Sequence, residues 1–172
     1  NGEKSAPLPR KLPDAIAALP LTGRLPLHTQ QALAMQAKPD QDPVLETGHT
    51  AVLFRRPQYV TVILSSAEVC LVPHATGLLA IDYIRACHPE QVHLASRVWL
   101  SQPDARHFSF GIAPWNREEQ VNPAPGAWLW VPLDRHDIAP ETSSNLTRFF
   151  GTQAPLEFLP DQALRQMARV TA

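Results

Sequence analysis

The sequence has few lysines, few glycines, only two cysteines and no long apolar run. Its 172 residues include three lysines and seven glycines. The 15 basic residues are nearly balanced by 16 acidic ones, which gives a net charge of −1. A nucleic-acid-binding domain usually carries a clear excess of basic residues on one surface. No stretch approaches the ~20 consecutive apolar residues of a membrane-spanning helix. The composition therefore predicts no nucleic-acid partner and no membrane-spanning helix.

The sequence also lacks the short motifs that carry common enzyme chemistry. It contains no Gly-x-Ser-x-Gly elbow, Cys-x-x-Cys pair, His-Glu-x-x-His zinc motif, phosphate-binding glycine loop or dinucleotide fingerprint. We therefore expect a protein that is not an enzyme, with no catalytic residues and no cofactor. A hydrolase that cleaves glycosides is the less favoured alternative, because many folds can bring two carboxylates together.

Proline, in contrast, is abundant. The 18 prolines are about twice the average share of ~5%, which favours rigid turns and short strands over a helical bundle. Between residues 57 and 133, segments rich in β-branched and aromatic residues predict strands, and Thr76 is expected to cap a helix at 77–87. The expected strands cover residues 59–64, 69–72, 97–101, 107–112 and 127–131. The resulting order β-β-α-β-β-β, with one helix across a mixed sheet, predicts a β-grasp domain.

The flanking segments predict further elements. After residue 134 the apolar residues recur with a helical period, behind a Thr-Ser-Ser cap region and ahead of a glycine that can end a helix. The fold class that we expect is α+β, mainly β, with a C-terminal amphipathic helix. The expected elements are a helix at 12–19, strands at 21–27 and 50–55, a helical turn at 30–37, a helix from Thr142 to Gly151 and an amphipathic segment from Pro160.

The two cysteines and the scattered histidines offer little metal chemistry. Cys70 and Cys87 either form a disulfide, worth roughly 3 kcal/mol by loop-closure entropy, or remain buried free thiols. Cys87, His88 and His93 form the one cluster that hints at a metal. Their spacing matches no zinc pattern and a fourth ligand is missing, so we predict no metal site.

Three residues are candidates for ligand binding: Arg24, Trp128 and Trp130. On an extended segment the Arg24 side chain points away from Leu25 and Leu27, and a guanidinium suits a carboxylate or paired sugar hydroxyls. The alternative is an exposed arginine or one that pairs with an acid. The two tryptophans lie two residues apart and share one face of a strand, where indoles can stack on sugar rings. Their alternative role is core packing.

Five short motifs appear in an order that resembles the GfcC-type capsule biosynthesis family. The resemblance covers roughly residues 20–133. The motifs are Thr22-Gly-Arg-Leu-Pro26, the Arg56-Pro57 step into Val60-Thr-Val62, Asp82-Tyr83, Ala113-Pro-Trp-Asn116 and Pro123-Ala-Pro-Gly-Ala-Trp-Leu-Trp130.

This resemblance implies a periplasmic, non-enzymatic accessory protein of capsule or exopolysaccharide secretion. It implies β-grasp domains similar to those of the outer-membrane polysaccharide export channel, and Arg24 as the residue of a ligand pocket. Capsules often contain acidic sugars, so an acidic sugar is the expected ligand. The expected domains are a partial or small first β-grasp lobe with a helical lead-in at 1–56, a second β-grasp domain at 57–133 and a helical tail at 134–172.

The partners follow from the same resemblance. They are a polysaccharide or acidic sugar, and the export channel or a sister protein of the same operon. Docking on the export channel is the alternative function, and a polysaccharide-modifying hydrolase is the less favoured one. Family members have further structure upstream of the Thr22 motif, so the first lobe is expected to be incomplete. An unpaired sheet edge there invites a homodimer or a docked protein. If the helical tail is the docking element, a chain that ends at Leu133 should keep its fold and lose its partner.

Overall fold

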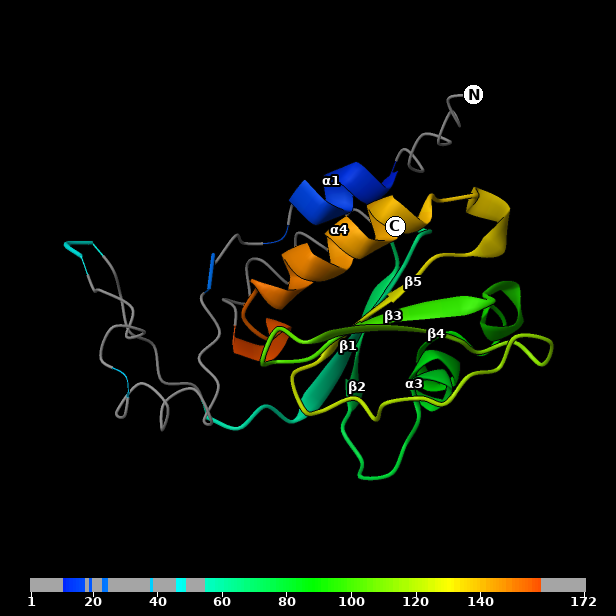
Figure 1. Cartoon of the computed structure of the whole chain (residues 1–172), viewed down its shortest axis with the longest axis horizontal. Coiled ribbons are helices and arrows are strands. Elements are labelled where there is room, and N and C mark those ends of the chain that lie inside the picture. The colour runs from blue at the N-terminus through cyan, green and yellow to red at the C-terminus, as the bar shows by residue number, and fades with distance from the viewer. Residues whose placement is uncertain are drawn as a thin grey trace.

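A five-stranded mixed sheet forms the centre of the protein (Figure 1). The structure is a computed structural model, and it describes residues 11–17, 19, 23–24, 38, 46–48 and 55–158. The strands lie in the order β2-β1-β5-β3-β4; β1 pairs with β5 in parallel, and the other pairs are antiparallel. The strands are β1 (Tyr59–Leu64), β2 (Val69–Pro73), β3 (Arg97–Ser101), β4 (His107–Gly111) and β5 (Trp128–Val131).

The predicted strands between residues 57 and 133 are confirmed within one residue at each end. The central strands β1 and β5 consist mostly of β-branched and aromatic residues and are almost fully buried, as expected of strands that are covered on both faces. The observed element order, two strands, a helix and three strands, also agrees with the prediction. The fold class α+β is therefore confirmed.

Helix α3 (Ala80–Cys87) covers one face of the sheet and closes the first hydrophobic core. This core contains Tyr83 and Ile84 together with apolar side chains from all five strands. The predicted start of this helix at Gly77, capped by Thr76, is wrong by three residues. Gly77 has φ +86°, which a right-handed helix does not accommodate, and the Leu79 N–H instead donates to Asp82 Oδ2 at 3.0 Å.

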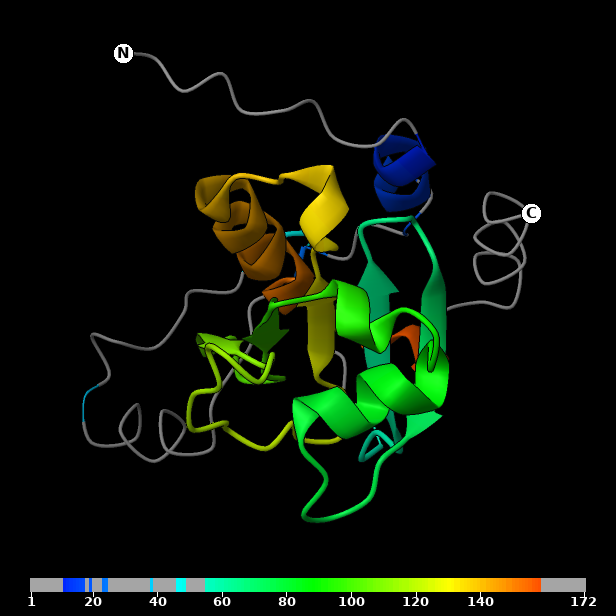
Figure 2. The ribbon, with the colours of Figure 1, turned by 90° about the vertical axis from the view of Figure 1, so that its right-hand side faces the viewer.

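Helices α1 (Lys11–Ala17) and α4 (Pro140–Gly151) lie side by side on the opposite face (Figures 1 and 2). Together with outward-facing side chains of β1, β3 and β5 they form a second hydrophobic core. Helix α4 begins at Pro140, earlier than the predicted Thr142 cap, because a proline suits the first helical turn. Its predicted end at Gly151 is confirmed. Helix α1 confirms the short helix predicted at 12–19, although it ends earlier.

The remaining described elements are short 3-10 turns. They are η2 (Val92–Leu94), η3 (Asp134–His136) and η4 (Leu156–Phe158). Among the described residues, no helix has both the length and the apolar character that crossing a membrane requires.

Several sequence predictions lie outside the described residues. These are the helical turn at 30–37, the segment from Pro160, and most of the strands at 21–27 and 50–55. The division into domains at 1–56, 57–133 and 134–172 stays a prediction. Within the predicted tail, however, α4 packs directly on β3 and β5, so this helix belongs to the same folded body as the sheet.

Candidate functional site

Arg24 lies where the end of α4 meets the turn between β3 and β4. Its Nη2 donates to the carbonyl oxygen of Pro103 at 2.8 Å and to that of Gly151 at 3.4 Å. Its backbone N–H donates to the carbonyl oxygen of Thr152 at 2.8 Å. The last carbonyls of a helix lack partners within the helix and favour a cation. The guanidinium is therefore held at the carboxyl end of α4.

The positive charge of Arg24 has no counter-charge among the residues that the structure describes. The side chain is half-buried and forms no ion pair with any described residue, and its Nε is buried without a hydrogen-bond partner. Burial lowers the pKa of the Arg24 guanidinium, because removal from water disfavours the charged form. An uncompensated, partly buried charge is costly. This corner of the protein therefore favours an anion.

The same corner is crowded around Gly151. A Cβ built on this glycine would lie 2.8 Å from both the His107 ring and Ser101 Oγ. Ser101 is fully buried, and its hydroxyl has no hydrogen-bond partner among the described residues. The pKa of His107 is lowered, first by burial and then by the nearby charge of Arg148. The charge of Asp104 raises this pKa but does not offset the other two effects. Ser101 was missed from the sequence; the only signal was a small polar residue at the end of a strand.

Trp128 and Trp130 do not form an exposed platform. Trp128 is 3% exposed and Trp130 is fully buried. Both indoles face α4, where the Trp128 ring stacks on Phe150 with a centroid distance of 5.4 Å and an interplanar angle of 2°. The interpretation of these tryptophans as a stacking surface for sugars is corrected: they pack in the second core, which was the stated alternative.

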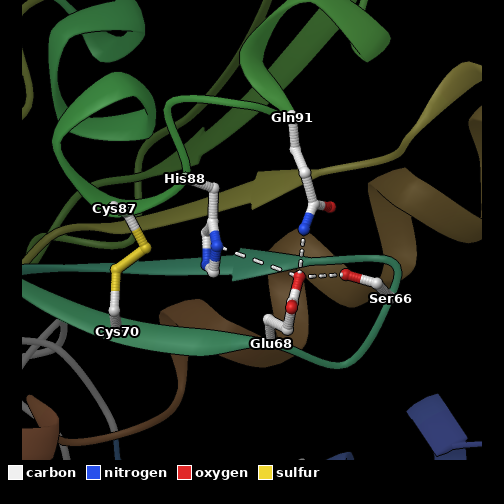
Figure 3. Close-up of a disulfide and its surroundings, with 6 residues drawn as sticks. All are labelled: Ser66, Glu68, Cys70, Cys87, His88 and Gln91. Atoms are coloured by element: carbon white, nitrogen blue, oxygen red, sulfur yellow. Dashed lines mark hydrogen bonds and ion pairs between the residues drawn. A yellow bond between two sulfur atoms is a disulfide. The ribbon is translucent and has the colours of Figure 1, made fainter.

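Cys70 and Cys87 form a disulfide that joins β2 to the end of α3 (Figure 3). Their Cα atoms are 6.2 Å apart, within the usual range for such a bond. The structure therefore settles the alternative of free thiols left open by the sequence. His88 lies beside the two sulfurs, but the bond occupies both of them, so this group offers no thiolate to a metal.

Next to the disulfide, Glu68 connects the β1–β2 turn to the loop after α3 (Figure 3). Its Oε2 accepts hydrogen bonds from Ser66 Oγ at 2.8 Å and Gln91 Nε2 at 2.7 Å, and lies 3.8 Å from His88 Nδ1. Burial pushes the pKa of Glu68 upward, but the hydrogen bonds from Ser66 and Gln91 and the charge of His88 outweigh it, so the pKa is lowered. The contacts of Glu68 hold the β1–β2 turn against the loop after α3, so their role is structural.

Removing the disulfide is expected to lower the free energy of unfolding by about 3 kcal/mol, the loop-entropy value for a separation of 17 residues. The change is the double variant Cys70→Ala, Cys87→Ala, compared with the parent in urea unfolding. Dithiothreitol should move the midpoint of the parent towards that of the variant and leave the variant unmoved. Equal midpoints for parent and variant would contradict the expectation.

One comparison places part of the chain among known proteins. Residues 68–150, just under half of the chain, match the family model described as capsule biosynthesis GfcC C-terminal. The match runs from the start of β2 to the last turn of α4. No curated protein matches the chain. The match confirms the predicted resemblance over residues 68–133. The two motifs before residue 68, and Arg24 with them, lie outside the matched segment.

Proposed function

Residues 68–150 match the family model of GfcC-type capsule biosynthesis proteins, and from this premise we propose a function. We propose that the chain is a periplasmic, non-enzymatic accessory protein of capsule or exopolysaccharide biosynthesis and export. It works by binding an acidic sugar of the polysaccharide at Arg24. The family supports the process, and the uncompensated charge of Arg24 supports the ligand.

The arrangement of the sheet supports the β-grasp part of this proposal. The first and last strands lie side by side and parallel in the middle of the sheet, and α3 crosses one face. This is the order that a β-grasp domain requires. If the export channel also contains β-grasp domains, the two proteins share this domain architecture.

The single observation that carries the ligand is the state of the Arg24 guanidinium. One nitrogen is engaged by backbone carbonyls, the Nε is unpartnered, and no described carboxylate neutralises the charge. A uronate carboxylate would supply both the counter-charge and hydrogen-bond acceptors in the planar geometry that guanidinium prefers. Hydrogen bonds to charged groups are worth about 1.5–3 kcal/mol each, enough for selective binding of an acidic sugar.

Replacing Arg24 with methionine is expected to weaken the binding of a galacturonate trisaccharide by about tenfold or more, which corresponds to ~1.4 kcal/mol or more. Methionine keeps much of the apolar stem and removes the charge. The measurement is calorimetric titration, with melting temperatures recorded for each protein. Arg85→Met is the matched control, because Arg85 lies exposed on α3 in an ion pair with Asp82.

Equal affinity in the Arg24→Met variant and the parent would sink the acidic-sugar proposal. Arg24→Lys serves as the second variant, since it retains a cation without the planar fork. It is expected to bind with intermediate affinity. A large fall in melting temperature with both variants would instead assign the arginine to holding α4 against the β3–β4 turn.

An exposed tryptophan favours a second function, docking on the export channel or a sister protein. Trp115 is 74% exposed, in the loop after β4, which is an outer strand of the sheet. Exposed aromatic side chains are common anchors of protein interfaces. Trp115→Ala should then abolish capture of the purified periplasmic part of the channel and leave the melting temperature unchanged. Unchanged capture would exclude this loop as the docking element.

A further inference from the structure

A hollow of about 230 Å³ lies between the start of β3, the segment after β5 and the first turns of α4. This volume is below the ~300–1,000 Å³ of typical small-molecule pockets, so it suits a single small ring. The residues that line it include Arg97, Trp99, Asp134, Asp137, Ile138 and Ser143. We call it the β3–α4 hollow.

We propose that the β3–α4 hollow binds one neutral pyranose ring. This goes beyond the proposed acidic-sugar site, because the hollow lies at the amino end of α4, whereas Arg24 lies at the carboxyl end. A 12-residue helix is about 18 Å long at ~1.5 Å per residue. The two positions are therefore separate sites on one side of the molecule, and one polysaccharide chain with alternating sugar types would meet both.

Ser143 is the first reason. It lines the hollow and is 1% exposed, yet its hydroxyl has no hydrogen-bond partner within the described part of the chain. A serine within a helix commonly bonds back to a carbonyl one turn earlier, as Thr147 does to the Ser143 carbonyl at 2.7 Å. A buried polar group without a partner costs free energy. A ligand hydroxyl in the hollow would satisfy it.

Trp99 supplies the apolar wall. Its side chain is half-buried and packs, with Ile138, against the second core. Trp128 and Trp130 are buried, whereas Trp99 keeps part of its indole at the hollow. An indole presents a flat apolar surface with a polar N–H at its edge. Such a surface matches the C–H face of a pyranose.

The charges around the hollow favour a neutral sugar over an acidic one. The Arg97 guanidinium is already engaged, with Nη2 at 3.1 Å from Glu118 Oε1. Asp134 Oδ1 accepts from the backbone N–H and the hydroxyl of Ser96. The Asp137 carboxylate has no partner among the described residues. The unpartnered carboxylate of Asp137 is a negatively charged hydrogen-bond acceptor, so it can accept from a sugar hydroxyl and repels a uronate.

The test follows the four indole N–H signals of the ¹⁵N-labelled full chain during titration with methyl α-glucopyranoside, methyl α-galactopyranoside and methyl α-mannopyranoside. Trp99→Phe assigns its signal. The expected result is a saturable shift of the Trp99 signal with at least one neutral glycoside and none with glucuronate. Ser143→Ala and Asp137→Asn should each weaken binding by about three- to tenfold, the value of one hydrogen bond.

The variants are chosen so that the outcome does not depend on folding. Ser143→Ala removes a hydroxyl that has no partner, so the fold should be retained, and Ser144→Ala on the next position is the matched control. Arg24→Met should leave the Trp99 shift unchanged, which separates this site from the acidic-sugar site. The proposal is overturned by the absence of a saturable Trp99 shift, by equal response to glucuronate, by unchanged affinity in Ser143→Ala, or by loss of binding in Arg24→Met.

Discussion

Replacing Phe150 with alanine is expected to lower the free energy of unfolding by about 3–5 kcal/mol, the usual cost of removing a buried phenylalanine ring. The ring is 1% exposed and lies at the centre of the second core. It stacks on Trp128 and contacts Trp130 and Phe149, with centroid distances of 5.4, 6.4 and 5.7 Å. The cavity left behind lies between α4 and the sheet, where rigid indoles cannot easily close it.

The measurement is chemical denaturation monitored by tryptophan fluorescence, because Trp128 and Trp130 report directly on this core. Arg148→Ala is the matched control: it changes an exposed residue of the same helix and should alter the free energy of unfolding by no more than about 0.5 kcal/mol. A loss below about 1 kcal/mol for Phe150→Ala would mean that α4 is not firmly packed on the sheet, against the usual cost of such a cavity.

The strands of this protein were predictable because their signals are local. β-branched and aromatic segments separated by prolines identify β1, β3 and β5 from the chain alone. Helix starts were less predictable. Thr76 is a good capping residue in isolation, but Gly77 adopts a positive φ. The helix begins only at the point where the Asp82 carboxylate can accept a hydrogen bond from the Leu79 N–H. The competition between two nearby caps depends on backbone angles that the sequence leaves open.

The candidate site was less predictable than the fold, because its contacts join distant segments. Trp128 and Trp130 were correctly placed on one face, but what covers that face comes from Phe150 and from α1, which is far upstream. Likewise, the partners of Arg24 are carbonyls of Pro103 and Gly151, and backbone groups leave no residue-type signature. Side-chain chemistry could be inferred from the sequence, whereas burial could not.

The largest effect is expected from removing α4 altogether. The docking hypothesis predicts that a chain ending at Leu133 folds and loses only its partner. Since Trp128, Trp130 and Ile63 are all covered in the second core, we expect instead that this shortened chain loses the native fold. Each buried aromatic ring covers ~150–250 Å², or about 4–6 kcal/mol at ~25 cal/mol/Å². Uncovering two indoles and losing Phe150 would together cost up to about 12–18 kcal/mol on this scale, which is as large as the roughly 5–15 kcal/mol that stabilises a whole domain.

The shortened chain should therefore show red-shifted tryptophan fluorescence, collapsed amide dispersion in its NMR spectrum and no cooperative unfolding. A chain ending at Phe158, which keeps every contact described for α4, is the control and should unfold cooperatively. If the Leu133 chain instead gives a dispersed spectrum and a sharp transition, α4 is a detachable element. Loss of partner capture on its removal would then be evidence for docking, whereas an unfolded chain makes the same loss uninformative, and docking must be tested by surface changes such as Trp115→Ala.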